Sequence, residues 1–133
     1  MTTSPEPLRI AIGENNADLA ASLAMLIDLQ PDLCCVGHAP TTGAVLVLAE
    51  RERPDTYVLD LTLDDGSSIP LIRTLRERQP GCAIIAFTGL GDPQLAVQCR
   101  NAGCDATLYK DGQVRALLAT LREHDPRRKA AAT

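Results

Sequence analysis

Residues 57–66 of this chain read Tyr-Val-Leu-Asp-Leu-Thr-Leu-Asp-Asp-Gly, an apolar run that ends at Asp60 and gives way to a turn-rich segment. The run predicts a buried strand with Asp60 at its carboxyl end, which is where open α/β sheets bind ligands. A carboxylate held there is partly desolvated and can act as a nucleophile or as a cation ligand. A lone Asp after a strand more often caps the following loop, so the residues that end the other strands decide between these interpretations.

Apolar strands and amphipathic helices alternate on both sides of this stretch. Residues 82–87 form an unbroken apolar run, as expected of a strand buried on both faces of a parallel sheet. Asp18 and Asp92 are the expected N-caps of two helices, and Gly103 is an expected C-cap. Strands are predicted at residues 8–12, 34–37, 56–59, 82–87 and 106–109, and helices at about residues 18–29, 42–53, 69–78, 93–102 and 113–123.

Five strands that alternate with five helices predict an α/β fold, a doubly wound five-stranded parallel sheet. Because crossovers are right-handed, the flavodoxin-like (βα)5 arrangement with strand order 2-1-3-4-5 is favoured at this length. A chain of 133 residues is long enough for one substantial core. We expect a single domain over residues 1–126 and a frayed tail over residues 127–133.

Composition and charge exclude several classes of function. A net charge of −4 argues against non-specific nucleic-acid binding by this domain. No apolar run reaches membrane-spanning length, and residues 1–6 lack the features of a signal peptide, so a cytoplasmic protein without membrane contact is expected. The five cysteines include no C-x-x-C pair, which favours buried free thiols over a zinc site.

Polar residues stand at the carboxyl ends of four predicted strands. Glu14 and Asn15 follow the first strand and Asp60 follows the third, so all three should converge at the point where the strand order reverses. Thr88 and Lys110 reach the same edge from the fourth and fifth strands. The lysine is informative because the chain has eleven Arg and only two Lys, and a compact ammonium stands at this position.

Such a set suits phosphoryl transfer onto a carboxylate. Asp60 would attack phosphorus and form an acyl phosphate, and a hard divalent cation with oxygen ligands would neutralise the phosphoryl oxygens. Thr88 would donate a hydrogen bond to one phosphoryl oxygen, while Lys110 would pair with another and with Asp60.

Over about residues 8–123 the chain resembles the receiver domain of two-component response regulators. The resemblance rests on the acidic element after the first strand, the Asp-Leu-x-Leu-x-Asp-Gly-Ser run after the third, Thr-Gly after the fourth and Lys after the fifth. It implies that Asp60 is the phosphoacceptor, Thr88 the switch hydroxyl and Lys110 the family's lysine. It also implies a Mg²⁺ cradle made of Glu14, Asn15, Asp60 and the backbone carbonyl of Thr62.

By the same resemblance the protein is a signalling module and not an enzyme beyond self-phosphorylation or self-dephosphorylation. Its phosphoryl donor would be a sensor histidine kinase or a phosphotransfer protein. The output would use the face of the fourth helix, fifth strand and fifth helix, and a homodimer through that face follows only by analogy.

Four positions depart from the family pattern. Asn15 replaces a second acid and should weaken Mg²⁺ binding, since a neutral amide supplies less charge than a carboxylate. Asp64 stands where proline is usual, and Ser68 where glycine is common. Thr107, three residues before Lys110, takes the place of the usual aromatic switch residue. Tyr109 is only one residue before Lys110, so its side chain is expected to point to the other face of the sheet.

Alternative functions stay open at this point. Asn15 and Thr107 favour a degenerate receiver, a protein-interaction module whose state does not depend on phosphate. A hydrolase with an aspartyl-phosphate intermediate is disfavoured because Thr62 stands where haloacid-dehalogenase-like phosphatases carry a second acid. A flavin carrier is disfavoured by the near-absence of aromatic residues.

Overall fold

The computed structural model describes residues 6–89, 91–111 and 114–131. Five parallel strands form one sheet in the order β2-β1-β3-β6-β7, while β4 and β5 pair as a separate small hairpin. Counted along the main sheet, this order is the predicted 2-1-3-4-5, so the doubly wound fold is confirmed. The strands of the sheet are β1 (Leu8–Gly13), β2 (Leu33–Ala39), β3 (Thr56–Leu59), β6 (Ala83–Thr88) and β7 (Ala106–Tyr109).

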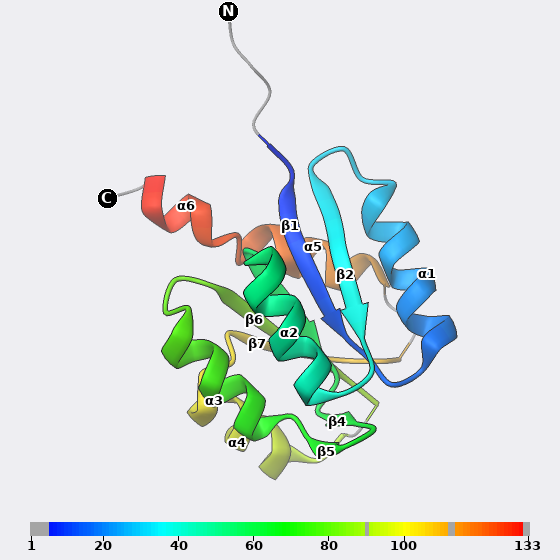
Figure 1. The fold of residues 1–133 in the computed structure, drawn as a ribbon, viewed down its shortest axis with the longest axis vertical. Coiled ribbons are helices and arrows are strands. Elements are labelled where there is room, and N and C mark those ends of the chain that lie inside the picture. Colours follow the sequence, from blue (N-terminus) through cyan, green and yellow to red (C-terminus); the bar gives the residue numbers. More distant parts are fainter. Residues whose placement is uncertain (1–5, 90, 112–113, 132–133) are drawn as a thin grey trace, which may run out of the picture.

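Helices cover both faces of the sheet (Figure 1). One face carries α2, α3 and α4, and the opposite face carries α1 and α5. The helices are α1 (Ala17–Asp28), α2 (Thr42–Glu52), α3 (Ile69–Arg78), α4 (Pro93–Ala102), α5 (Val114–Glu123) and α6 (Pro126–Ala131).

Two apolar cores follow from the alternation of side chains along the strands. In β1, Ala11 packs in the core beneath α2 and α3, whereas Ile10 and Ile12 pack in the core beneath α1 and α5. In β3, Tyr57 and Val58 divide between the two cores in the same way. The central strands are therefore mostly apolar, because both of their faces are covered.

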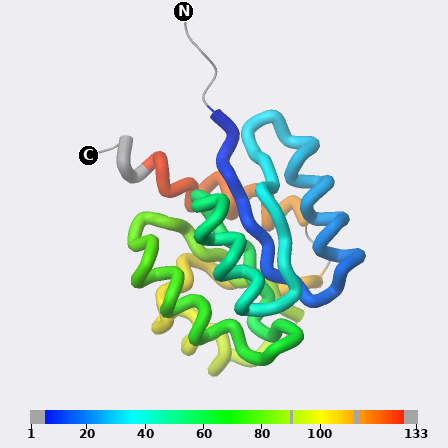
Figure 2. The backbone as a smooth tube through the Cα atoms, in the orientation of Figure 1, coloured from blue at the N-terminus to red at the C-terminus, as the bar shows by residue number. Residues whose placement is uncertain are grey.

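The start of β1 and the C-terminal α6 lie at the same end of the molecule, as the tube in Figure 2 shows. The Arg127 guanidinium donates to the carbonyl of Glu6 at 2.7 Å. Helix α6 includes residues 127–131 of the predicted frayed tail, and residues 132 and 133 lie outside the described residues. Pro126 suits the first helical position, and the Asp125 carboxylate accepts from the Arg127 N–H at 2.9 Å, which caps the helix.

Helix α1 begins earlier than predicted. Its N-cap is Asn16 and not Asp18, because the Asn16 side-chain oxygen accepts from the Leu19 N–H at 3.1 Å. Asp18 lies instead in the first turn, where its negative charge also suits the helix dipole. The predicted caps Asp92 and Gly103 are confirmed for α4.

The turn-rich segment after β3 is an ordered hairpin of β4 (Thr62–Leu63) and β5 (Gly66–Ser67). The Asp65 carboxylate accepts from the N–H and the hydroxyl of Thr42 at 2.8 and 2.6 Å. The N–H of Asp64 donates to the Pro40 carbonyl at 3.0 Å. These contacts attach the loop after Asp60 to the start of α2 and to the residue just before its N-cap.

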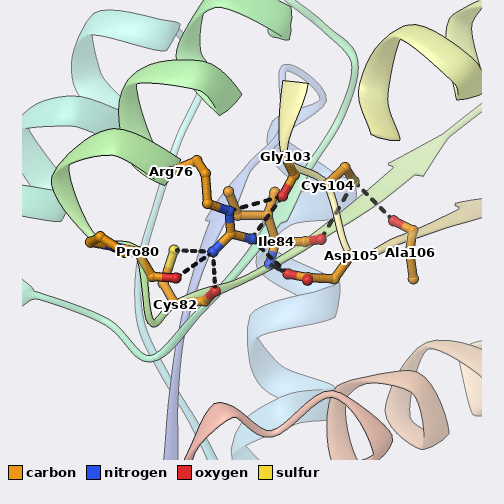
Figure 3. A network of polar contacts seen from close by, with 8 residues as sticks. All are labelled: Arg76, Pro80, Cys82, Ile84, Gly103, Cys104, Asp105 and Ala106. Carbon is orange, nitrogen blue, oxygen red and sulfur yellow. Dashed lines mark hydrogen bonds and ion pairs between the residues drawn. The ribbon is translucent and has the colours of Figure 1, made fainter. Parts of the chain in front are cut away.

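Arg76, on α3, joins three segments at the sheet edge where β6 and β7 begin (Figure 3). Its guanidinium reaches the Gly103 carbonyl at 2.7 Å and the Asp105 carboxylate at 2.8 Å. It also donates to the carbonyls of Pro80 and Cys82 at 2.9 and 2.7 Å. The same Asp105 oxygen accepts from the Ile84 N–H at 2.8 Å. One side chain thus fixes the end of α4 against the starts of β6 and β7.

Arg122, on α5, forms a two-pronged ion pair with Asp32 in the loop before β2, with Nε–Oδ2 at 2.7 Å and Nη2–Oδ1 at 3.0 Å. The hydrogen bond from Arg122 lowers the pKa of Asp32. Because that pKa is lowered on folding, the pair stabilises the protein at neutral pH, and this contribution is lost as the pH falls through the folded-state pKa. Both side chains are well exposed, so solvent screening limits the contribution to no more than about 1 kcal/mol.

We therefore expect Arg122→Met to raise the pKa of Asp32 toward its ordinary value. A ¹³C-detected titration of the Asp32 carboxyl carbon measures the change. Arg115→Met, which removes an exposed guanidinium from the same helix, should leave that titration unchanged. An unaltered Asp32 titration in Arg122→Met would contradict the assignment of this ion pair.

All five cysteines are free thiols, and Cys82, Cys99 and Cys104 are buried as predicted. Cys34 and Cys35 are only half-buried because β2 is an edge strand. Within the described parts of the chain, no helix has the length and apolar character needed to cross a bilayer.

Candidate functional site

Three charged side chains meet at the carboxyl edge of the sheet. Glu14 follows β1, Asp60 follows β3 and Lys110 follows β7. The Lys110 ammonium lies between the two carboxylates, 2.5 Å from Glu14 Oε1 and 2.7 Å from Asp60 Oδ2. Strands distant in sequence thus place two carboxylates and one ammonium within hydrogen-bonding distance. The Lys110–Asp60 contact was expected from the sequence, whereas the Lys110–Glu14 contact was not.

Lys110 is held in its charged form. Burial alone lowers the pKa of Lys110, but hydrogen bonds to Asp60 and Glu14 more than offset that effect and leave the pKa raised. Its ammonium also lies 6.0 Å from the centre of the Phe87 ring, at the outer limit of a cation–π contact. The backbone N–H of Lys110 donates to the Thr88 carbonyl at 2.8 Å, which fixes the base of the side chain.

Glu14 is 3% exposed, unusual for a carboxylate, and both of its oxygens have partners. Oε1 pairs with Lys110, and Oε2 accepts from the Asn16 N–H at 3.0 Å. Since the Asn16 side chain caps α1, the same short segment orients the acid and starts the helix. Burial of Glu14 is tolerated because the charge is paired and hydrogen-bonded.

Asp60 is anchored through its backbone as well as its side chain. Its N–H donates to the Gly13 carbonyl at 2.8 Å, and its carbonyl accepts from the Ser68 hydroxyl at 2.5 Å. In the side chain, Oδ2 pairs with Lys110 and Oδ1 accepts from the Thr62 N–H at 3.3 Å. The side chain is mostly buried, with 11% of its surface exposed, and its backbone is fixed on both sides.

The other predicted residues surround this cluster at different depths. Thr88, the last residue of β6, is buried beside Lys110, whereas Asn15 and Thr62 are exposed at the rim. Thr107 lies in β7 and contacts α4. Contact with Cys104 and burial raise the pKa of Cys99, and the nearby Thr107 acts in the opposite direction. Thr107 therefore packs with the thiols and does not join the charged cluster.

The chemistry of the donors fits a hard divalent cation, since carboxylate, amide and carbonyl oxygens are available around Asp60. Over residues 6–89, 91–111 and 114–131, however, no group of three or more His, Cys, Asp or Glu side chains is placed to hold a metal ion. A cation here would need neutral oxygen ligands beside the two carboxylates.

Two contributors to the site carried little signal in the sequence. Ser68 was notable only as a serine where the resembling family commonly has glycine, and its hydroxyl proves to bind the Asp60 carbonyl. Gly13 contributes a backbone carbonyl, and a Cβ there would lie 2.8 Å from Leu59 Cδ2. The apolar packing around Gly13 could not be read from the sequence before the strand order was known.

Comparisons with known proteins find relatives over most of this chain. The model of the response regulator receiver domain family matches residues 10–122. The nitrate/nitrite response regulator protein NarL of Escherichia coli (strain K12) is 27% identical over 121 residues, which cover 91% of this chain and 56% of that protein. The DNA-binding transcriptional activator DevR/DosR of Mycobacterium tuberculosis is 26% identical over 104 residues, 78% of this chain and 48% of that protein.

Solved structures share the fold. The response regulator receiver domain protein (CheY-like) from Methanospirillum hungatei JF-1 superposes with a TM-score of 0.85 at 25% identity, covering 94% of this chain and 99% of that one. The chain spans about half the length of the curated relatives named above. With the family model matched from β1 to α5 and the charged cluster at the expected edge, the chain belongs to the response regulator receiver domain family, the signalling modules of two-component systems.

Proposed function

We propose that this domain accepts a phosphoryl group on Asp60 from a histidine kinase or a phosphotransfer protein. The observation that carries the proposal is the Asp60 carboxylate, fixed at a strand end with the Lys110 ammonium at 2.7 Å and with part of its surface still exposed. A positioned carboxylate beside a fixed ammonium suits phosphoryl transfer, in which positioning and charge stabilisation supply most of the catalysis.

In the proposed step, one Asp60 oxygen attacks phosphorus as the bond from phosphorus to the donor imidazole nitrogen breaks. The electron pair of that bond stays on the imidazole, and an acyl phosphate forms on Asp60. Lys110 pairs with a phosphoryl oxygen, and the Thr88 hydroxyl donates to another. Glu14 stays paired with Lys110 and keeps the ammonium in the pocket.

Mg²⁺ suits the oxygen donors of this pocket and, when bound, neutralises negative charge on phosphoryl oxygens. Glu14, Asp60, the Asn15 amide oxygen and the Thr62 backbone carbonyl would hold it. Glu14 already uses both oxygens in contacts with Lys110 and Asn16, and Asn15 is neutral, so we infer that Mg²⁺ binds weakly.

The test is intact-mass spectrometry after incubation with Mg²⁺ and acetyl phosphate or phosphoramidate. A gain of one phosphoryl group is expected. Absence of any gain at high Mg²⁺ concentration, with the protein folded, would overturn the proposal. That result would favour a phosphate-independent interaction module, the alternative suggested by Asn15 and by the fully engaged Glu14.

Asn15→Asp should tighten Mg²⁺ binding by about 10-fold or more, because it adds a carboxylate among the expected ligands. Titration calorimetry with Mg²⁺ measures the change. Asn16→Asp is the matched control: it adds the same charge one residue later, where the side chain caps α1. Equal Mg²⁺ affinities for Asn15→Asp and Asn16→Asp would remove Asn15 from the proposed ligands.

The output is proposed to use the face formed by α4, β7 and α5. Thr107 packs against Cys99 there in place of the aromatic residue usual in the family, so an aromatic rotamer change is not available at that position. DevR/DosR is named as a DNA-binding transcriptional activator and extends beyond the matched region. We infer that the part that responds to this domain is either a further domain of the same protein or a separate protein.

A further inference from the structure

We infer that Ser68 is a positioning residue for Asp60, an inference that rests on the proposed phosphoacceptor function. Its hydroxyl holds the peptide group that follows Asp60 and thereby sets how the carboxylate and the Thr62 segment face the pocket. The Ser68 Oγ lies 2.5 Å from the Asp60 carbonyl oxygen, and Ser68 is fully buried.

The Ser68 hydroxyl does not make the hydrogen bond that a serine usually makes at this position. Ser68 is the N-cap of α3, where a serine side chain ordinarily accepts a hydrogen bond from the first turn of its helix. It makes no such cap bond. The neighbouring Ser67 hydroxyl accepts from the Ile69 N–H at 3.2 Å instead, which leaves Ser68 to donate to Asp60.

With this bond, both main-chain polar groups of Asp60 are fixed by different elements. Its N–H is held by Gly13 at the end of β1, and its carbonyl by Ser68 at the start of α3. Because a peptide unit is planar, holding the carbonyl also holds the N–H of Leu61 and the direction in which the chain continues. The Ser68 N–H donates to the Leu61 carbonyl at 3.0 Å, which holds the next peptide group as well.

Without the hydroxyl, the Asp60 carbonyl loses a donor and its peptide group can tilt. The tilt would move both the attacking carboxylate and the neighbouring Thr62 carbonyl. Loss of a group that orients a ligand commonly costs about 10–100-fold in metal affinity or activity. Ser68→Ala removes the oxygen and keeps the Cβ, so it separates the hydrogen bond from the space that the side chain fills.

The experiment compares wild type, Ser68→Ala and Ser67→Ala in three measurements: the ¹³C′ shift of Asp60, the Mg²⁺ affinity from the Thr62 amide shift, and the rate of phosphorylation by acetyl phosphate. In Ser68→Ala we expect an upfield move of the Asp60 ¹³C′ resonance and about 10-fold weaker Mg²⁺ binding. We expect a maximal phosphorylation rate reduced about 10-fold, with the half-saturating donor concentration unchanged. Ser67→Ala should match wild type in all three.

Two results would overturn the inference. One is an Asp60 ¹³C′ shift in Ser68→Ala no larger than in Ser67→Ala, and the other is a shifted resonance with wild-type Mg²⁺ affinity. Neither result depends on phosphorylation. A wild type that takes up no phosphoryl group would therefore refute the proposed function, while the ¹³C′ shift and the Mg²⁺ affinity would still test the role of Ser68. If Ser68→Ala does not fold, Ser68→Gly, the residue common in the family at this place, replaces it with the same expected results.

Discussion

Asp60→Asn should take up no phosphoryl group from acetyl phosphate in the presence of Mg²⁺, while wild type gains one. An amide lacks the anionic oxygen that attacks phosphorus, and it cannot form the acyl phosphate by this route. The fold should persist, because the backbone bonds from Asp60 to Gly13 and Ser68 do not involve the side chain, and Lys110 keeps Glu14 as a partner. Intact-mass spectrometry with peptide mapping reports the outcome.

Asp64→Asn is the matched control for this variant. It removes one carboxylate from an exposed position four residues later in the same loop. This variant should be phosphorylated as wild type is. Phosphoryl label on the peptide that contains residue 60 in Asp60→Asn would show that another side chain accepts the group, and the central assignment would then be wrong.

Arg76→Met should lower the free energy of unfolding by about 3 kcal/mol, the largest loss of stability that we expect from a single change outside the apolar cores. The substitution keeps most of the aliphatic stem and removes every guanidinium donor. The carbonyls of Cys82 and Gly103 and the Asp105 carboxylate then lose charged partners in a region that is only partly solvated. Urea denaturation measures the change.

Arg73→Met on the same helix provides the comparison, because Arg73 is exposed. It should change the free energy of unfolding by less than about 0.5 kcal/mol. Similar losses in the two variants would mean that the contacts of Arg76 contribute little. If Arg76→Met loses much of its free energy of unfolding but its folded fraction is still phosphorylated, Arg76 contributes to stability alone.

The fold was predictable because its determinants are local patterns. Apolar runs such as residues 82–87 and caps such as Asp92 mark the elements, and the handedness of crossovers leaves few strand orders. Glu14, Asp60 and Lys110 could be placed together for the same reason, since parallel strands bring their carboxyl ends to one edge.

The features that could not be predicted depend on tertiary contacts. Asn16 and Asp18 are both good N-cap residues, and only the backbone geometry after β1 selects the first. Arg76 binds backbone carbonyls far along the chain, and a carbonyl carries no signal in the sequence. The Ser68 hydroxyl acts on a backbone atom in the same way.

The pairing of Lys110 with both acids also sets how the pocket receives an anion. The carboxylates of Glu14 and Asp60 and the ammonium of Lys110 carry one net negative charge together. A third carboxylate, at position 15 in place of the Asn15 amide, would raise this to two. Under the proposed function, an approaching phosphoryl donor, itself an anion, would therefore meet less repulsion at this pocket than at one with three acids. Asn15, which we expect to weaken the attraction of the pocket for a cation, would thus also ease the approach of a phosphate.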